Sequence, residues 1–127
     1  MAQGSSNNVA VWFEIPTQDF ARAKRFYERV FAVKLIDEQM GPMRLGVFPH
    51  ADEVVSGCII FGEGYRPARD GNVVYLDGGE DLAGPLSRVE AAGGQVLVGK
   101  TLINDEIGYF AHVLDTEGNR VGLHSRH

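Results

Sequence analysis

The fold is decided by residues 9–31, VAVWFEIPTQDFARAKRFYERVF, which read as an apolar strand, a turn and a helix that begins just after Asp19. The same order recurs in residues 73–94, VVYLDGGEDLAGPLSRVEAAGG, where Asp81 precedes the second helix and two glycines follow it. Counted from the two aspartates, the matching positions on a helical stripe are Phe20 and Leu82, Ala23 and Pro85, and Tyr27 and Val89. A duplicated strand–helix–strands unit has to bury two one-sided sheets together, so the repeat predicts a curved composite sheet around a cavity.

Each copy of the unit continues into short segments rich in strand-forming residues. The expected strands cover residues 9–15, 34–38, 43–48, 54–61, 72–76, 95–98, 109–114 and 120–125, and the expected helices cover 20–31 and 82–92. Asp19 is well placed to cap the first helix, and Pro85 can lie only in the first turn of the second. Residues 99–107 read as a mixed loop, while Gly118 can supply the positive φ of a tight hairpin. Because strands outnumber the two short helices, we predict an α+β fold with a mostly antiparallel sheet.

The length of the chain, 127 residues, suits one domain with a real core and is too small for two independent ones. We therefore expect a single domain over residues 1–127. Its first module covers about 9–61, and its second covers about 72–125. Residues 62–71, GEGYRPARDG, are rich in chain breakers and form the connector between the modules. Residues 1–8 read as a polar tail.

Composition excludes several function classes. Twelve basic against seventeen acidic residues give a net charge of -5, which disfavours nucleic acid as a partner because phosphate binding needs a concentrated basic surface. No apolar core of a signal peptide is visible, and no apolar stretch approaches the ~20 residues that cross a bilayer, so no membrane role is expected. Cys58 is the single cysteine and lies in an apolar run, which predicts a core thiol and a reducing, cytoplasmic location.

Three segments together resemble a known family. They are FEIPTQDFARAKRFYERVF at 13–31, RVEAAGG at 88–94 and YFAHVLDTEGNRVGL at 109–123. The combination is similar to the vicinal oxygen chelate superfamily, which includes glyoxalase I, extradiol dioxygenases, and the fosfomycin- and bleomycin-resistance proteins. The likeness extends from about Val9 to Ser125. It implies a glyoxalase-like fold, in which two βαβββ modules form a cup-shaped sheet that a second subunit commonly completes, and therefore a homodimer.

The resemblance also implies where metal ligands should stand, since metal-dependent members hold one divalent ion in the cup. The first-strand ligand, seven residues before the helix-capping aspartate, falls on Trp12, and its counterpart in the second module falls on Val74. The glutamate of the last strand falls on Gly122, and residues 56–61 contain neither a carboxylate nor a histidine. Indole, isopropyl and hydrogen side chains offer no lone pair to a cation, so we expect no metal and no other cofactor.

Two polar residues lie near the positions at which metal ligands are expected but non-ligating residues occur. Glu14 lies two residues after Trp12 and His124 two residues after Gly122, so the period of a strand places each on the same face as its neighbour. A carboxylate and an imidazole could transfer protons as catalytic residues, or hold a displaced divalent metal. The alternative is that Glu14 hydrogen-bonds within the sheet and His124 is solvated near the C-terminus.

Further ligand-binding candidates come from the connector and from the second module. Tyr65 and Arg66 could close over a ligand and bind an anionic group, or could belong to a solvated loop. His112 lies mid-strand on the face of Phe110, where a core or rim histidine is the alternative to a ligand-binding one. Trp12 and the aromatic residues of both modules offer surface for a planar ligand.

Two functions from different classes remain. The first is a metal-independent, bleomycin resistance-like protein that binds a small organic ligand by burial and stacking. The second is a glyoxalase-like lyase or isomerase that uses Glu14 and His124 in proton transfer or in an altered metal site. An accessory protein without a ligand is a third possibility.

Overall fold

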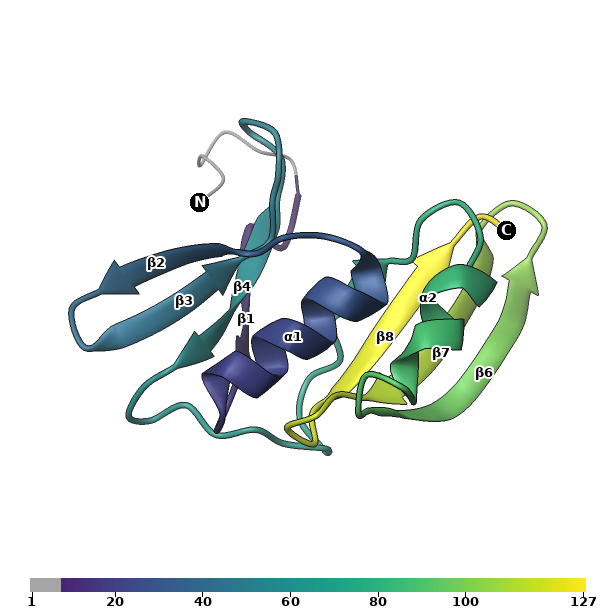
Figure 1. Ribbon diagram of the computed structural model, residues 1–127. Coiled ribbons are helices and arrows are strands. Elements are labelled where there is room, and N and C mark those ends of the chain that lie inside the picture. The colour runs from purple at the N-terminus through teal and green to yellow at the C-terminus, as the bar shows by residue number, and fades with distance from the viewer. Residues whose placement is uncertain (1–7) are drawn as a thin grey trace.

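The computed structural model describes residues 8–127, so the predicted polar tail lies outside them except for Asn8 (Figure 1). In chain order the elements are β1 (Trp12–Pro16), α1 (Phe20–Phe31), β2 (Ile36–Met40), β3 (Met43–Val47), β4 (Ser56–Phe61), β5 (Tyr75–Asp77), α2 (Ala83–Val89), β6 (Gln95–Asn104), β7 (Gly108–Leu114) and β8 (Arg120–Ser125). β1 and β4 pair in parallel, as do β5 and β8, and the other pairs are antiparallel. The predicted α+β fold of two βαβββ modules is confirmed.

No helix within residues 8–127 is long and apolar enough to span a membrane.

The strands form two four-stranded sheets, in the orders β1-β4-β3-β2 and β5-β8-β7-β6. Figure 1 shows the two sheets side by side, with α1 and α2 in front of them on the same side. β1 and β5 each end their own sheet, and within residues 8–127 no hydrogen-bonded ladder joins them. The composite sheet is therefore built as two halves, one from each module.

Local signals place the first helix as predicted. The Asp19 carboxylate accepts a hydrogen bond from the Arg22 backbone N–H at 3.0 Å, which satisfies one of the free amides at the start of α1. Ala32 ends the helix in the left-handed region, with a φ of 53°. The buried stripe of α1 is Phe20, Ala23, Phe26, Tyr27 and Val30.

Strand boundaries depend on partners more than on composition. β1 begins at Trp12 rather than at Val9, because its partner β4 begins at Ser56, opposite Trp12. The predicted loop over residues 99–107 is wrong, since β6 continues to Asn104 and pairs with β7 through Leu102 and Tyr109. The register shifts between Val98 and Thr101, so the pairing continues across an irregular stretch that reads as loop in the sequence.

The second helix is shorter than the predicted residues 82–92 and covers Ala83–Val89. The Asp81 carboxylate accepts a hydrogen bond from the Ala83 backbone N–H at 2.8 Å, and Pro85 lies buried in the first turn. The tight turn before β8 also follows the prediction, because Gly118 has a φ of 88°.

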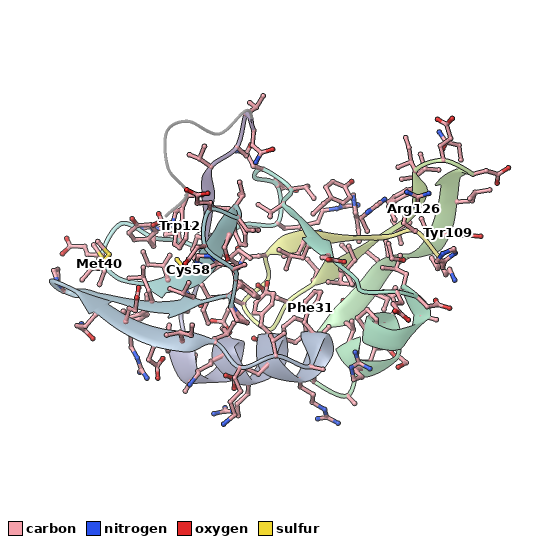
Figure 2. All side chains as sticks on the ribbon, turned by 90° about the horizontal axis from the view of Figure 1, so that it is seen from above. Trp12, Phe31, Met40, Cys58, Tyr109 and Arg126 are labelled. Carbon is pink, nitrogen blue, oxygen red and sulfur yellow. The ribbon has the colours of Figure 1, made fainter. Side chains whose placement is uncertain are left out.

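Each sheet has one face against the helices and one face away from them. The helix-side cluster unites both modules, and its buried members include Ile15, Tyr27, Ile59, Leu82, Val113 and Leu123. A second cluster on the other side of the first sheet consists of Leu45, Val47, Cys58 and Ile60, with Trp12, Met43 and Tyr65 packed against it. We call the face of each sheet that points away from the helices its open face. In Figure 2, Trp12 and Cys58 lie on one side of the first sheet and α1 on the other.

Candidate functional site

A cavity of about 970 Å³ lies between the two sheets. Residues of both modules line it, from the edge strands β1 and β5 and from the start of α2. Its aromatic lining residues are Trp12, Phe13, Phe31, Phe48 and Tyr75. Asp77, Asp81 and Arg88 add charged groups on the side of the second module. A cavity of this size with mainly aromatic and aliphatic walls is of the kind that holds small organic molecules.

The open face of the first sheet brings together two predicted site residues. Tyr65, from the connector, packs against the apolar cluster there, and its hydroxyl donates a hydrogen bond to the Glu14 carboxylate. This hydrogen bond and the negative charge of Glu14 raise the pKa of Tyr65, because the phenol proton is held by its acceptor. Glu14 is exposed and Trp12 is half-buried, so one carboxylate stands at the rim of an apolar surface.

Cys58 lies directly opposite Glu14 in the β1–β4 ladder and is fully buried. Burial, followed by the negative charge of Glu14, raises the pKa of the Cys58 thiol to about 12. A thiol in this state remains protonated and is a poor nucleophile and metal ligand. The predicted core role of Cys58 agrees with this environment.

The open face of the second sheet carries a chain of three polar side chains. The Tyr75 hydroxyl lies 2.6 Å from Nε2 of His112, and Nε of Arg120 donates to Nδ1 of the same ring at 3.0 Å. Burial, and then the positive charge of Arg120, lower the pKa of His112. Gly122 stands between these residues in the sheet, opposite both Tyr75 and His112. A Cβ on Gly122 would lie 2.4 Å from the Tyr75 ring, so glycine allows the ring to lie across β8.

His124 is half-buried on the same face of β8, next to Phe110 in the ladder. Its Nε2 lies 2.7 Å from the Ile107 carbonyl oxygen, and an acceptor at that distance requires this nitrogen to donate. Together with Tyr75 it lines two further cavities of about 420 and 380 Å³. This hydrogen bond ties His124 on β8 to the turn between β6 and β7.

The predicted pair of Glu14 and His124 is divided between the two sheets. Within residues 8–127 no hydrogen bond or ion pair joins them, since Glu14 binds Tyr65 and His124 binds Ile107. Arg66 is exposed and lines none of the three cavities, whereas Tyr65 from the same connector packs on the open face. Their roles in catalysis or binding stay predictions.

The metal-ligating side chains of a single chain are not arranged to bind a divalent cation. Across residues 8–127, no three histidine, cysteine, aspartate or glutamate side chains converge on a point where they could hold a metal ion. Transition metals and zinc in proteins ordinarily take at least three protein donors. On the open faces, Glu14 and His112 are already engaged by Tyr65 and by Tyr75 with Arg120.

One inferred equivalence between the modules is wrong. Val74 packs against the helix-side cluster, so it does not match Trp12, which packs on the open face. Ile15 precedes Asp19 by four residues, whereas its helix-side counterpart Leu76 precedes Asp81 by five. The turn of the second module, with Gly79 at a φ of 86°, is one residue longer, and one residue reverses the face of a strand. Counting seven residues back from Asp81 gives Val74, whereas the residue on the open face is Tyr75.

The sequence matches the profile of the Glyoxalase/Bleomycin resistance protein/Dioxygenase superfamily over residues 9–123. No curated protein sequence matches the chain closely enough to count as a relative. Glyoxalase I from Zea mays is similar in structure, with a TM-score of 0.68 and 19% identity over 91% of this chain and 45% of that chain. This chain therefore spans less than half of the maize protein.

Two bacterial structures are similar over nearly their whole length. A glyoxalase/bleomycin resistance protein from Streptomyces sp. CB03234 has a TM-score of 0.65 and 22% identity, covering 90% of this chain and 97% of that chain. TnmS3, an antibiotic binding protein from the same organism, has a TM-score of 0.62 and 20% identity, covering 93% and 95%. At these identities the likeness shows a shared fold. Because the family profile matches nearly the whole chain and the modules have the expected topology, this chain belongs to the Glyoxalase/Bleomycin resistance protein/Dioxygenase superfamily.

Proposed function

We propose that the protein binds a small, planar organic ligand without a divalent metal, in the cavity between its two sheets. The observation that carries this proposal is the cavity itself, about 970 Å³, with aromatic side chains from both modules in its walls. Burial and stacking of a flat ligand against such rings contribute most of the binding energy in sites with few polar groups. Trp12 has the largest ring in this lining and is only half-buried, so part of its surface is free for a ligand.

Two further findings support a binder over a metal-dependent enzyme. Metal-ligating side chains do not converge among residues 8–127, and Cys58 is held as a thiol. TnmS3, which shares the fold, is an antibiotic binding protein, so this architecture serves ligand binding in at least one relative. A cytoplasmic location agrees with the single free, buried cysteine.

We also propose a homodimer. Within residues 8–127, β1 and β5 end their sheets with edges that pair with no further strand, and edges of this kind are usually covered in native proteins. The β6–β7 hairpin exposes Leu102, Ile103 and Ile107, each by more than 40% of its surface. A second copy that covers these side chains would enclose the open faces and remove apolar surface from water.

The binding proposal is tested with 8-anilinonaphthalene-1-sulfonate, an aromatic fluorescent probe that becomes bright in apolar sites. Titration of the native protein should saturate, and Trp12→Ala should weaken binding roughly two- to tenfold, as the loss of one aromatic contact does. Glu14→Gln should bind as the native protein does, because it keeps the size of the side chain and changes only its charge. Phe61→Ala is the matched control, since Phe61 is an exposed aromatic residue outside the cavity lining.

The variants also separate the two classes of function. If Glu14→Gln weakens probe binding and Trp12→Ala does not, the aromatic-burial proposal fails and the lyase or isomerase hypothesis, with Glu14 as base, gains support. If Phe61→Ala weakens binding as much as Trp12→Ala, the probe binds the surface generally and the cavity proposal fails.

A further inference from the structure

Tyr75 is the residue that all three described cavities share. It lies on β5, while its hydrogen-bond partner His112 is on β7 and Arg120 is on β8, so three strands hold the chain Tyr75–His112–Arg120 in place. The Tyr75 hydroxyl is 2.6 Å from His112 Nε2, and Arg120 Nε is 3.0 Å from His112 Nδ1. Tyr75 itself is 51% exposed and lines all three of these cavities.

The direction of each hydrogen bond follows from the chemistry of the guanidinium group. Arg120 carries only donors, so Nδ1 of His112 has to accept and bears no proton. A neutral imidazole then carries its proton on Nε2 and donates it to the Tyr75 oxygen. Burial and the charge of Arg120 lower the pKa of His112, which favours this neutral form. The Tyr75 oxygen therefore receives a hydrogen bond, and its own proton remains to be donated elsewhere.

No other partner for this hydroxyl exists among residues 8–127. The cavity of about 380 Å³ next to it is walled by Phe110, Ile103 and His124, and the Nε2 donor of His124 is already taken by the Ile107 carbonyl. Among the four described residues that line this cavity, Tyr75 is the one whose side-chain donor has no acceptor. Arg120, held by the same histidine, adds a positive charge that favours electron-rich oxygens.

We propose that Tyr75 is a specificity-determining residue that donates a hydrogen bond to an acceptor oxygen, carbonyl or phenolate, on a planar conjugated ligand packed against Phe110. This inference rests on the proposed ligand-binding function, names the chemical class of that ligand, and extends its site from the cavity between the sheets past Tyr75 into the smaller cavity at Phe110. His112 and Arg120 act as positioning residues, because they fix the direction in which the hydroxyl donates. A ligand that presents only donors, or no polar atom, would leave the Tyr75 proton unpaired and lose affinity.

The probe pair for the test is 4-nitrophenolate and nitrobenzene, which share a flat ring and differ in one acceptor oxygen. The native protein should bind 4-nitrophenolate more tightly and shift its absorption titration toward the ionised form. Tyr75→Phe should weaken 4-nitrophenolate binding roughly tenfold and leave nitrobenzene unchanged, as expected for a hydrogen bond to a charged group. Tyr109→Phe is the matched control, since Tyr109 packs on the helix-side cluster.

A second measurement reads the hydrogen-bond direction without any ligand. Long-range ¹H–¹⁵N NMR should show His112 as the Nε2–H tautomer in the native protein, and Arg120→Gln should remove the fixed tautomer. A native Nδ1–H tautomer would overturn the inference, as would equal binding of both probes by native protein and Tyr75→Phe. If 8-anilinonaphthalene-1-sulfonate still saturates in that case, the proposed function stands while the role of Tyr75 fails. If no probe saturates, both fail.

Discussion

The Glu117 carboxylate, in the turn between β7 and β8, binds the Arg22 side chain on α1 at 2.8 Å across 95 residues of sequence. Its other oxygen accepts the backbone N–H groups of Gln18 and Asp19, each at 2.8 Å, and the Glu117 side chain is fully buried. The carboxylate therefore stabilises the positive end of α1 from the other module. Beside it, the Tyr27 hydroxyl donates to Asp115 at 2.6 Å, and Asn119 Nδ2 donates to the Pro16 carbonyl oxygen at 2.8 Å, so three residues of the turn join the modules.

Glu117→Gln should lower the free energy of unfolding by about 2 kcal/mol at pH 7, because an amide cannot accept all of these hydrogen bonds and carries no charge for Arg22. Although burial opposes ionisation, hydrogen bonds from Arg22, Asp19 and Gln18 lower the pKa of Glu117 from 4.5 to about 2. A folded pKa below the unfolded one stabilises the protein above pH 4.5, and the contribution is lost as the pH falls toward 2.

Urea unfolding of native protein and Glu117→Gln between pH 7 and pH 2.5 checks this dependence, and the difference between the two should shrink as the pH falls. Glu63→Gln in the exposed connector is the control and should change stability little at any pH. A difference that stays constant with pH would show that the charge of Glu117 is not what stabilises α1.

Gly122→Ala should destabilise the protein by about 1–3 kcal/mol, since the added methyl group overlaps the Tyr75 ring and cannot be accommodated without displacement. The same change should alter the NMR signals of His112, whose partner Tyr75 has to move. Gly99→Ala is the control, because a Cβ there meets no atom within 4 Å. Equal effects of the two substitutions would contradict the contact between Gly122 and Tyr75.

The protein purified without chelators should contain far less than one transition metal per chain, because Trp12 and Gly122 offer no ligand and no three metal-ligating side chains converge within residues 8–127. Inductively coupled plasma mass spectrometry measures this directly. A ratio near one metal per chain that disappears in Glu14→Ala would overturn the metal-independent proposal.

The protein in solution should have twice the chain mass of 13.9 kDa, since a second copy can cover the exposed β6–β7 hairpin and the free strand edges. Light scattering coupled to gel filtration at high micromolar concentration checks the mass. Ile103→Lys should shift the protein toward the monomer, because a charge in an apolar contact is costly to desolvate. A native mass equal to one chain would rule out the dimer.

Sequence by itself determined the features that depend on near neighbours in the chain. The repeat of strand and helix, the Asp19 cap of α1 and the turn at Gly118 all follow from residues within a few positions of one another. The burial of Cys58 was predictable because the residues that follow it on β4, Ile59, Ile60 and Phe61, are apolar. These elements form as expected since local geometry and hydrophobic pattern favour the same structure.

Tertiary structure alone decided which distant side chains meet. The length of β6 depends on its ladder with β7, and the face of Tyr75 depends on one extra residue in the turn before α2. His112 and Arg120 lie on neighbouring strands and were readable as a pair only once the register of β7 and β8 was known. The alternation of side chains along a strand does not determine such contacts. A shift of one residue in register or turn length moves every side chain to the opposite face.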